Sequence, residues 1–261
     1  MKSKSKLGQN FLIDPAACAA IVAALGDLST RTVIEIGPGA GAITEMLAAR
    51  VGRLVAIELD HELVLNLRVQ FPRVDVMEAD VLTVDFAALQ KNQEKLLVVG
   101  NLPYYITSPI LLHLFAASHL VQAAVIMMQR EVAERVLAAP GSSDYGILSA
   151  TTRLYARAER ILDLPPEAFM PPPRVHSTVL RLNFQPQFAE LDVQPEPFLR
   201  FLRQSFAQKR KTLAKNLRAT GYSSADVTAA MESVGIAPAA RAEQIDLRPM
   251  VALFHVLSRQ R

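Results

Sequence analysis

Short apolar runs alternate with amphipathic stretches over the first half of the chain. Five of these runs have the length and the β-branched content of buried strands, and they cover residues 32–36, 54–58, 74–77, 96–100 and 123–128. Helical spacing of apolar residues occurs at 15–25, 42–51, 61–70 and 108–117, and a further helix is predicted from residue 130. Because strand and helix alternate, we predict an α/β fold built on a mostly parallel, doubly wound sheet.

The pattern changes after residue 150. Strands are predicted at 157–164 and 178–184, and the Met170-Pro-Pro-Pro segment between them is too rich in proline for either helix or sheet. We expect these two strands to form an antiparallel pair around a stiff loop. From Pro195 onward the spacing is helical, with turns at Gly221 and Gly235. The sequence therefore predicts a first domain over residues 1–185, a linker over 185–197 and a small all-helical domain over 195–261.

Composition sets the class of protein. The chain has 261 residues, 51% of them hydrophobic, and its single cysteine, Cys18, excludes an internal disulfide. The basic N-terminus is not followed by the apolar core of a signal peptide, and no run approaches the ~20 apolar residues of a membrane span. We therefore expect a soluble, cytoplasmic protein, with nothing that suggests more than a monomer. The five histidines are scattered without the spacing of metal ligands, so no metal site is predicted.

Positive charge is concentrated in two stretches, although the net charge is only +3. Residues 200–218 hold seven Lys or Arg and no acidic residue, and the N-terminal tail adds Lys2, Lys4 and Lys6. Such stretches on a nearly neutral protein suggest a surface for a polyanion, although a solvated helix face gives the same pattern. The candidate contacts are Lys209, Arg210, Lys211, Lys215 and Arg218, of which Lys211, Lys215 and Arg218 are predicted to share one helix face.

A glycine-rich turn, with glycines at Gly37, Gly39 and Gly41, lies between the first strand and its helix. Glycine allows a tight turn and close approach to a ligand, at the sheet edge where open α/β folds bind ligands. Glu58 ends the second strand and Asp80 lies just after the third, with Leu59 and Val81 beside them. Glu58 can accept hydrogen bonds from ribose hydroxyls, and Asp80 can accept from an adenine amino group. Each acid alone could instead cap a loop, but together they indicate the adenosine of S-adenosylmethionine.

The fourth strand is followed by Asn101-Leu102-Pro103-Tyr104. This segment presents an amide oxygen, a backbone carbonyl and an aromatic face, which suit a flat heterocycle with an exocyclic amino group. Pro103 fixes its own φ and restrains the residue before it. Phe169 is the candidate for the second ring face around the base, with an ordinary core aromatic as the alternative.

Several segments together give the chain a resemblance to the small-subunit ribosomal RNA adenine N6,N6-dimethyltransferases. The resemblance runs nearly end to end and is carried by the following segments: Gly8-Gln-Asn-Phe-Leu12, Glu35-Ile-Gly-Pro-Gly-Ala-Gly41, Asn101-Leu-Pro-Tyr-Tyr-Ile-Thr-Ser-Pro109, Met128-Gln-Arg-Glu-Val-Ala-Glu-Arg-Val136, Asp144-Tyr-Gly146, Phe169-x-Pro-Pro-Pro-x-Val175 and Phe206-Ala-Gln-Lys-Arg-Lys-Thr-Leu213. The glycine loop is shared by methyltransferases in general, whereas the first and last of these segments point to rRNA dimethylation. Ala40 stands where the family often has Leu.

The resemblance implies a Rossmann-like class I methyltransferase domain and a small helical domain. Its substrate would be two adjacent adenosines in a hairpin near the 3′ end of small-subunit rRNA, within an immature small subunit. Gln9, Asn10 and Leu12 would cover S-adenosylmethionine, Gly37 would line its methionine part, and Asn101 would lie by the sulfonium and the target amine. Glu58 would then hold the ribose and Asp80 the adenine.

Three other functions stay open from the sequence. A large-subunit rRNA adenine methyltransferase of the antibiotic-resistance type shares the fold and the Asn-Leu-Pro-Tyr segment. A non-catalytic ribosome assembly factor could use the same fold to bind immature subunits. A nicotinamide dehydrogenase is disfavoured because the glycine spacing is G-x-G-x-G rather than G-x-G-x-x-G.

Overall fold

The computed structural model describes residues 10–259, so Gln9 and the three lysines of the N-terminal tail lie outside the described residues. The chain divides into two compact units. The first contains the described residues up to Ala133 together with Arg157–Phe184, and the second contains Glu134–Ala156 and the described residues from Gln185 onward. The segment Glu134–Ala156 therefore groups with the C-terminal residues, although the sequence places it within the 1–185 stretch.

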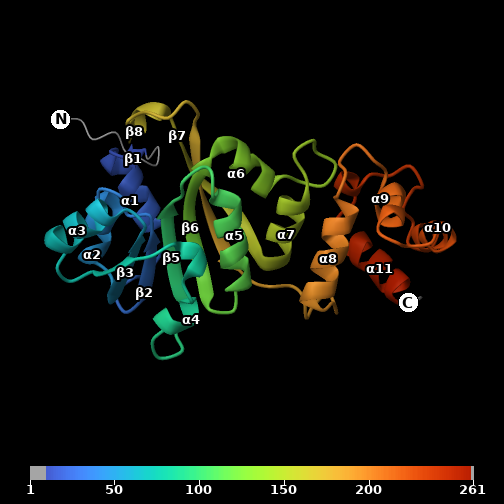
Figure 1. Cartoon of the computed structure of the whole chain (residues 1–261), viewed down its shortest axis with the longest axis horizontal. Coiled ribbons are helices and arrows are strands. Elements are labelled where there is room, and N and C mark those ends of the chain that lie inside the picture. Colours follow the sequence, from blue (N-terminus) through green and yellow to red (C-terminus); the bar gives the residue numbers. More distant parts are fainter. Residues whose placement is uncertain (1–9, 260–261) are drawn as a thin grey trace. The chain divides into compact units, whose positions relative to one another are not determined.

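A seven-stranded sheet with the order β4-β3-β2-β5-β6-β9-β7 forms the centre of the first unit (Figure 1). Its strands are β2 (Thr32–Ile36), β3 (Arg53–Glu58), β4 (Asp75–Glu78), β5 (Leu96–Asn101), β6 (Val121–Gln129), β7 (Ala156–Leu164) and β9 (Ser177–Phe184). The strands β4 to β6 in this order pair in parallel, and β9 runs antiparallel to β6. The predicted α/β fold with a mostly parallel sheet is confirmed, and β7 and β9 are neighbours as expected.

Helices cover both faces of this sheet. The helices and helical turns of the first half are α1 (Pro15–Ala23), α2 (Ala42–Ala48), α3 (His61–Gln70), η1 (Val81–Thr83), α4 (Phe86–Leu89), α5 (Thr107–Ala116) and α6 (Arg130–Leu137). Every second residue of the central strands, such as Val33, Leu97 and Val99, packs in one cluster with α1 and α2. Phe184 of β9 points to the other face, where its ring meets Phe115 of α5 edge-on at 6.3 Å.

A separate two-stranded sheet joins the beginning of the described chain to the proline-rich segment. It pairs β1 (Phe11–Leu12) with β8 (Phe169–Met170), which follows the turn η2 (Pro166–Ala168). The backbone N–H of Ile13 also donates to the carbonyl of Ala168 at 2.9 Å. Sequence periodicity did not predict this pairing, because a strand of two residues has no period to read.

The second unit is helical. Its helices are α7 (Ile147–Tyr155), α8 (Pro195–Ser205), α9 (Leu213–Ala219), α10 (Ser224–Ser233) and α11 (Leu247–Ser258), with a turn η3 at Ala242–Gln244. Phe198, Phe201 and Phe254 form an aromatic cluster at its core, with ring centroids 5.2–6.2 Å apart. The predicted helical character of this region is confirmed, and α7 is an additional helix.

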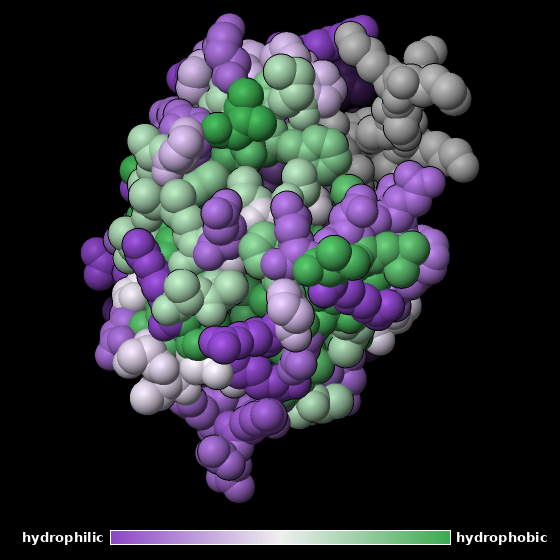
Figure 2. Space-filling view, turned by 90° about the vertical axis from the view of Figure 1, so that its left-hand side faces the viewer, coloured by the Kyte–Doolittle hydropathy of each residue, from purple (hydrophilic) through white to green (hydrophobic). Residues whose placement is uncertain are grey.

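Exposed large apolar side chains among the described residues include Ile13, Tyr105 and Leu112. Figure 2 shows the face of the first unit on the side of α1, α2 and α3, where apolar and hydrophilic side chains are interspersed. Leu65 and Val69, both on α3, are among the exposed apolar residues. Across residues 10–259, no helix has the length and apolar content needed to cross a membrane.

Candidate functional site

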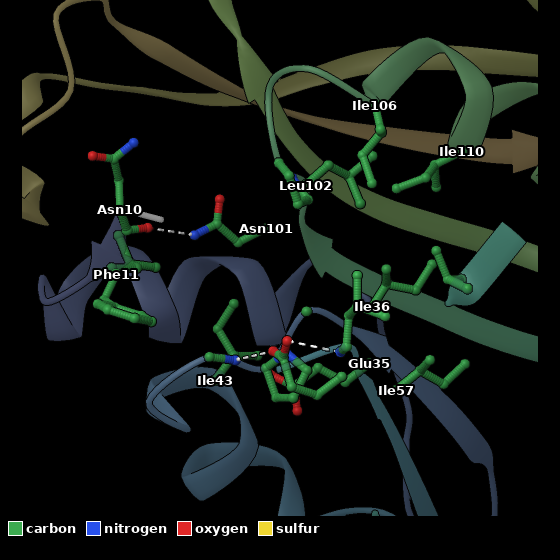
Figure 3. A pocket seen from close by; sticks show the side chains of 18 of the residues that line it. Asn10, Phe11, Glu35, Ile36, Ile43, Ile57, Asn101, Leu102, Ile106 and Ile110 are labelled. Atoms are coloured by element: carbon green, nitrogen blue, oxygen red, sulfur yellow. Dashed lines mark hydrogen bonds between the residues drawn. The ribbon is translucent and has the colours of Figure 1, made fainter. Parts of the chain in front are cut away.

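A cavity of about 240 Å³ lies where β2, β3 and β5 end (Figure 3). Most of the predicted site residues line it: Asn10, Leu12, Gly37, Gly39, Glu58, Leu59, Asp80, Val81, Asn101, Leu102, Pro103 and Tyr104. The lining residues that the sequence reasoning did not single out are mainly apolar, and they include Phe11, Ile36, Ile43, Ile57, Tyr105, Ile106 and Ile110. Sequence reasoning found the strand-end residues because parallel strands bring their carboxyl ends to one edge.

The glycine loop requires glycine at two positions for different reasons. Gly39 has a φ of +59°, and a Cβ there would lie 2.9 Å from the ring of Phe11, which covers the loop. Gly41 has a φ of +89°, and its Cβ would lie 2.6 Å from the ring of Phe71. Gly41 does not line the cavity. The absence of a side chain at Gly41 instead lets α2 begin close to the end of α3. Gly41 therefore shapes the loop without contacting the cavity.

Glu58 lies at the end of β3, where it is 4% exposed. One oxygen accepts from the backbone N–H groups of Leu59 at 2.8 Å and Asp60 at 3.0 Å, and the other accepts from Gly39 at 3.2 Å. A carboxylate offers about four acceptor positions, so capacity remains for a hydroxyl group. The residue therefore both caps its loop and presents an acceptor to the cavity.

Asp80 has a similar double role after β4. It is exposed, and one of its oxygens accepts from the N–H of Leu82 at 3.0 Å as the cap of η1. The residue also lines the cavity. Glu58 and Asp80 thus each accept backbone hydrogen bonds in their own loop and also line the cavity.

Glu35 is a third acid of the cavity, and it is almost fully buried at 1% exposure. Its carboxyl accepts a hydrogen bond of 2.7 Å from the hydroxyl of Thr44 on α2. Burial raises the pKa of Glu35 to about 7, against the opposing effect of the Thr44 hydrogen bond, and the charge of Glu58 adds to the rise.

The side chain of Asn101 is oriented by the segment that carries β1. Its Nδ2 donates to the backbone carbonyl of Asn10 at 3.1 Å, and Figure 3 shows this bond across the cavity. This bond uses one of the two N–H groups of the amide and fixes which way the amide points, so its oxygen stays available to accept from a ligand. At the next residues, the N–H of Leu102 donates to Met127 of β6, and the carbonyl of Pro103 accepts from Ile106 and Thr107. The backbone around Asn101 is therefore fixed.

The two aromatic residues proposed to face the base have different surroundings. Tyr104 lines the cavity, and its hydroxyl lies 2.8 Å from the hydroxyl of Ser177 on β9. Phe169 is 1% exposed, does not line the cavity and packs in the core with Leu12 and Leu164. Without a bound base the ring of Phe169 therefore packs in the core, because β8 pairs with β1 and turns this side chain inward. Its role as the second ring face around the base stays a prediction.

The predicted basic residues are exposed in the second unit, but not all lie on a helix. Lys209, Arg210 and Lys211 belong to a turn, because Thr212 caps α9 through a bond from the N–H of Lys215, so that the helix begins at Leu213. The predicted single helix face of Lys211, Lys215 and Arg218 was therefore wrong at Lys211. Nζ of Lys209 donates to the carbonyl of Ser143 at 2.5 Å, which ties this turn to the loop before α7.

Comparisons with known proteins cover nearly the whole chain, and they point to one family. A family model described as ribosomal RNA adenine dimethylase matches residues 1–259. Two relatives named ribosomal RNA small subunit methyltransferase A are similar: that of Acidobacterium capsulatum is 58% identical over 98% of this chain and 92% of its own, and that of Koribacter versatilis is 47% identical over 97% and 94%.

Two solved structures share the fold. The crystal structure of a dimethyladenosine transferase from Plasmodium falciparum has a TM-score of 0.82 at 23% identity and covers 96% of this chain and 98% of its own. The 23S rRNA methyltransferase ErmE has a TM-score of 0.71 at 25% identity, over 95% of this chain and all of its own.

Proposed function

Because the chain belongs to the ribosomal RNA adenine dimethylase family, we propose that its substrate is a pair of adjacent adenosines in a hairpin near the 3′ end of small-subunit rRNA. The reaction is S-adenosylmethionine-dependent N6,N6-dimethylation of rRNA adenine. The names of the relatives support the small subunit as the source of the RNA. We further propose that the enzyme acts as a monomer in the cytoplasm, on an immature subunit.

The lining of the cavity suits S-adenosylmethionine, because it combines acceptor groups with apolar side chains. Glycine at position 39 leaves room that a side chain would fill, next to the ring of Phe11. Glu58 would hold the ribose hydroxyls and Asp80 the adenine amino group, while the apolar side chains of the lining suit the faces of the adenine ring. S-adenosylmethionine supplies a methyl group that is already activated by its positive sulfur.

Asn101 carries the proposed chemistry. The amino group of adenine is a weak nucleophile because its lone pair is delocalised into the ring. The amide oxygen of Asn101 and the carbonyl of Leu102 would accept from its two N–H groups, which favours a tetrahedral nitrogen with its lone pair directed at the methyl group. As the nitrogen bonds to the methyl carbon, the carbon–sulfur bond would break with its electrons returning to sulfur, and the methylated nitrogen, now acidic, would lose a proton to water. The bond from Asn101 to Asn10 fixes the amide in the orientation that this role needs, and such preorganisation lowers the barrier by placement.

The target base must leave its helical stack to reach this position. Tyr104 would stack on one of its faces, and base–aromatic stacking is worth about 1–3 kcal/mol per base. The exposed residues Lys209, Arg210, Lys211, Lys215 and Arg218 would contact the phosphates, which position the RNA without reading its sequence.

A substrate comparison tests the proposed function. Labelled S-adenosylmethionine is supplied with unmethylated small subunits, large subunits or naked rRNA, and the modified bases are identified after digestion. We expect dimethyladenosine from small subunits. Label in large subunits alone would favour the resistance-type enzyme, and cofactor binding without any label would favour the assembly factor.

Removing two of the exposed lysines should weaken RNA binding in a salt-dependent way. For Lys211→Ala combined with Lys215→Ala, the slope of log affinity against log salt should fall by about 1–2, since each phosphate contact contributes about 0.7–0.9. Lys91→Ala with Lys95→Ala is the matched control, because both lysines are exposed, belong to the first unit and are not among the proposed contacts. An unchanged slope in the first variant would exclude these two contacts.

A further inference from the structure

We propose that Ser177 is a positioning residue: its hydroxyl holds the ring of Tyr104 at the angle that stacking on the target base requires. This inference rests on the proposed function, because it takes Tyr104 as the stacking residue. Ser177 itself does not line the cavity and would touch neither the base nor the cofactor.

The contact joins two segments that are far apart in the sequence. Tyr104 lies in the loop between β5 and α5, and Ser177 is the first residue of β9. Their hydroxyl oxygens are 2.8 Å apart, and Ser177 is 0% exposed. Burial raises the pKa of the Tyr104 hydroxyl, so it stays neutral and able to share a hydrogen bond with the serine.

Ser177 is itself rigidly placed, which makes it a suitable anchor. It pairs with Gln129 in the ladder between β6 and β9. The residues on both sides are bonded as well, since the carbonyl of His176 accepts from the N–H of Arg130 and the hydroxyl of Thr178 donates to Asp163. Because Ser177 is fixed in the central sheet, the hydrogen bond to its hydroxyl restrains the ring of Tyr104 relative to that sheet.

The need for an anchor follows from where Tyr104 lies. Its neighbour Tyr105, in the same loop, is 63% exposed, which shows that the loop alone does not bury an aromatic ring. A ring that is free to rotate must be ordered when the base arrives, and that ordering reduces affinity. Holding the ring beforehand at its hydroxyl end leaves both faces of the ring free of this contact.

A double-mutant cycle between Ser177 and Tyr104 tests the proposal. Ser177→Ala, Tyr104→Phe and the double variant are compared for kcat/KM on unmethylated small subunits and for the Kd of S-adenosylmethionine. Each single change should lower kcat/KM by about three- to tenfold, the range that corresponds to loss of one neutral hydrogen bond, and should leave the Kd unchanged. The double variant should be no worse than either single variant, because both remove the same contact.

The matched control is Thr178→Val, which removes a buried hydroxyl from the next residue of β9, on the opposite face of the strand. This variant should be less stable but should keep its kcat/KM. Additive losses in the double variant, or equal losses of kcat/KM in Thr178→Val, would overturn the positioning role. Absence of methyl transfer by the unaltered enzyme would instead refute the proposed function, so the two failures are distinguishable.

Discussion

Replacement of Asn101 by alanine should leave S-adenosylmethionine binding intact and slow methyl transfer by about a hundred- to a thousandfold. This is the usual cost of deleting one preorganised hydrogen-bonding group at a reaction centre. The amide is fixed by its bond to Asn10, so its oxygen is already in place before the substrate arrives. Loss of that oxygen removes placement of the amine rather than binding of the cofactor. The measurement is kcat on small subunits together with a cofactor titration.

The control for this variant is Asn66→Ala, which removes an exposed amide from α3. It should keep the full rate. Asn101→Asp separates two contributions, because it retains an acceptor oxygen but cannot donate to the carbonyl of Asn10. We expect an intermediate rate for it. Near-normal turnover by Asn101→Ala would refute the proposed role of Asn101 in placing the target amine.

Much of the candidate site could be predicted because it depends on the ends of parallel strands. Glu58 and Asn101 end β3 and β5, and Asp80 follows β4 by two residues. A run of apolar residues locates a strand, and the residue after it must then lie at the ligand-binding edge. Local sequence is sufficient for this inference, since it needs only the direction of each strand.

The parts that were not predicted depend on contacts between distant segments. Phe11 covers Gly39, and β1 pairs with β8, across more than 150 residues of sequence. That pairing also explains why the ring of Phe169 lies in the core. A short strand carries no periodic signal, so neither the pairing nor its effect on Phe169 could be read from the pattern.

The start of α9 is a different case, because the signal was present. Thr212 is a favoured capping residue, and its hydroxyl accepts from the N–H of Lys215. Recognition of this cap separates Lys211 from the helix and leaves the basic segment as a turn followed by a short helix. A prediction made from the spacing of the charges alone placed the start of this helix too early and so included Lys211.

The pH dependence of folding should reveal Glu35, whose pKa is about 7 in the folded protein and 4.5 in its ordinary state. Between these values the unfolded chain has lost its proton while the folded protein retains it. The free energy of unfolding therefore falls as pH rises from 4.5 to 7 and stays at the lower level above pH 7. With about 1.4 kcal/mol per pKa unit, the loss from this one group is about 3 kcal/mol.

Glu35→Gln removes this titration while keeping an oxygen that can accept from Thr44. In the absence of cofactor, we expect the variant to gain stability relative to the unaltered chain as pH rises, by about 3 kcal/mol between pH 4.5 and pH 8. Urea unfolding at four or five pH values measures the difference. Glu45→Gln, an exposed change on α2, should show no such trend. A difference between Glu35→Gln and the unaltered chain that is constant with pH would mean that folding does not raise the pKa of Glu35, because the bond from Thr44 then offsets the cost of burying the charge.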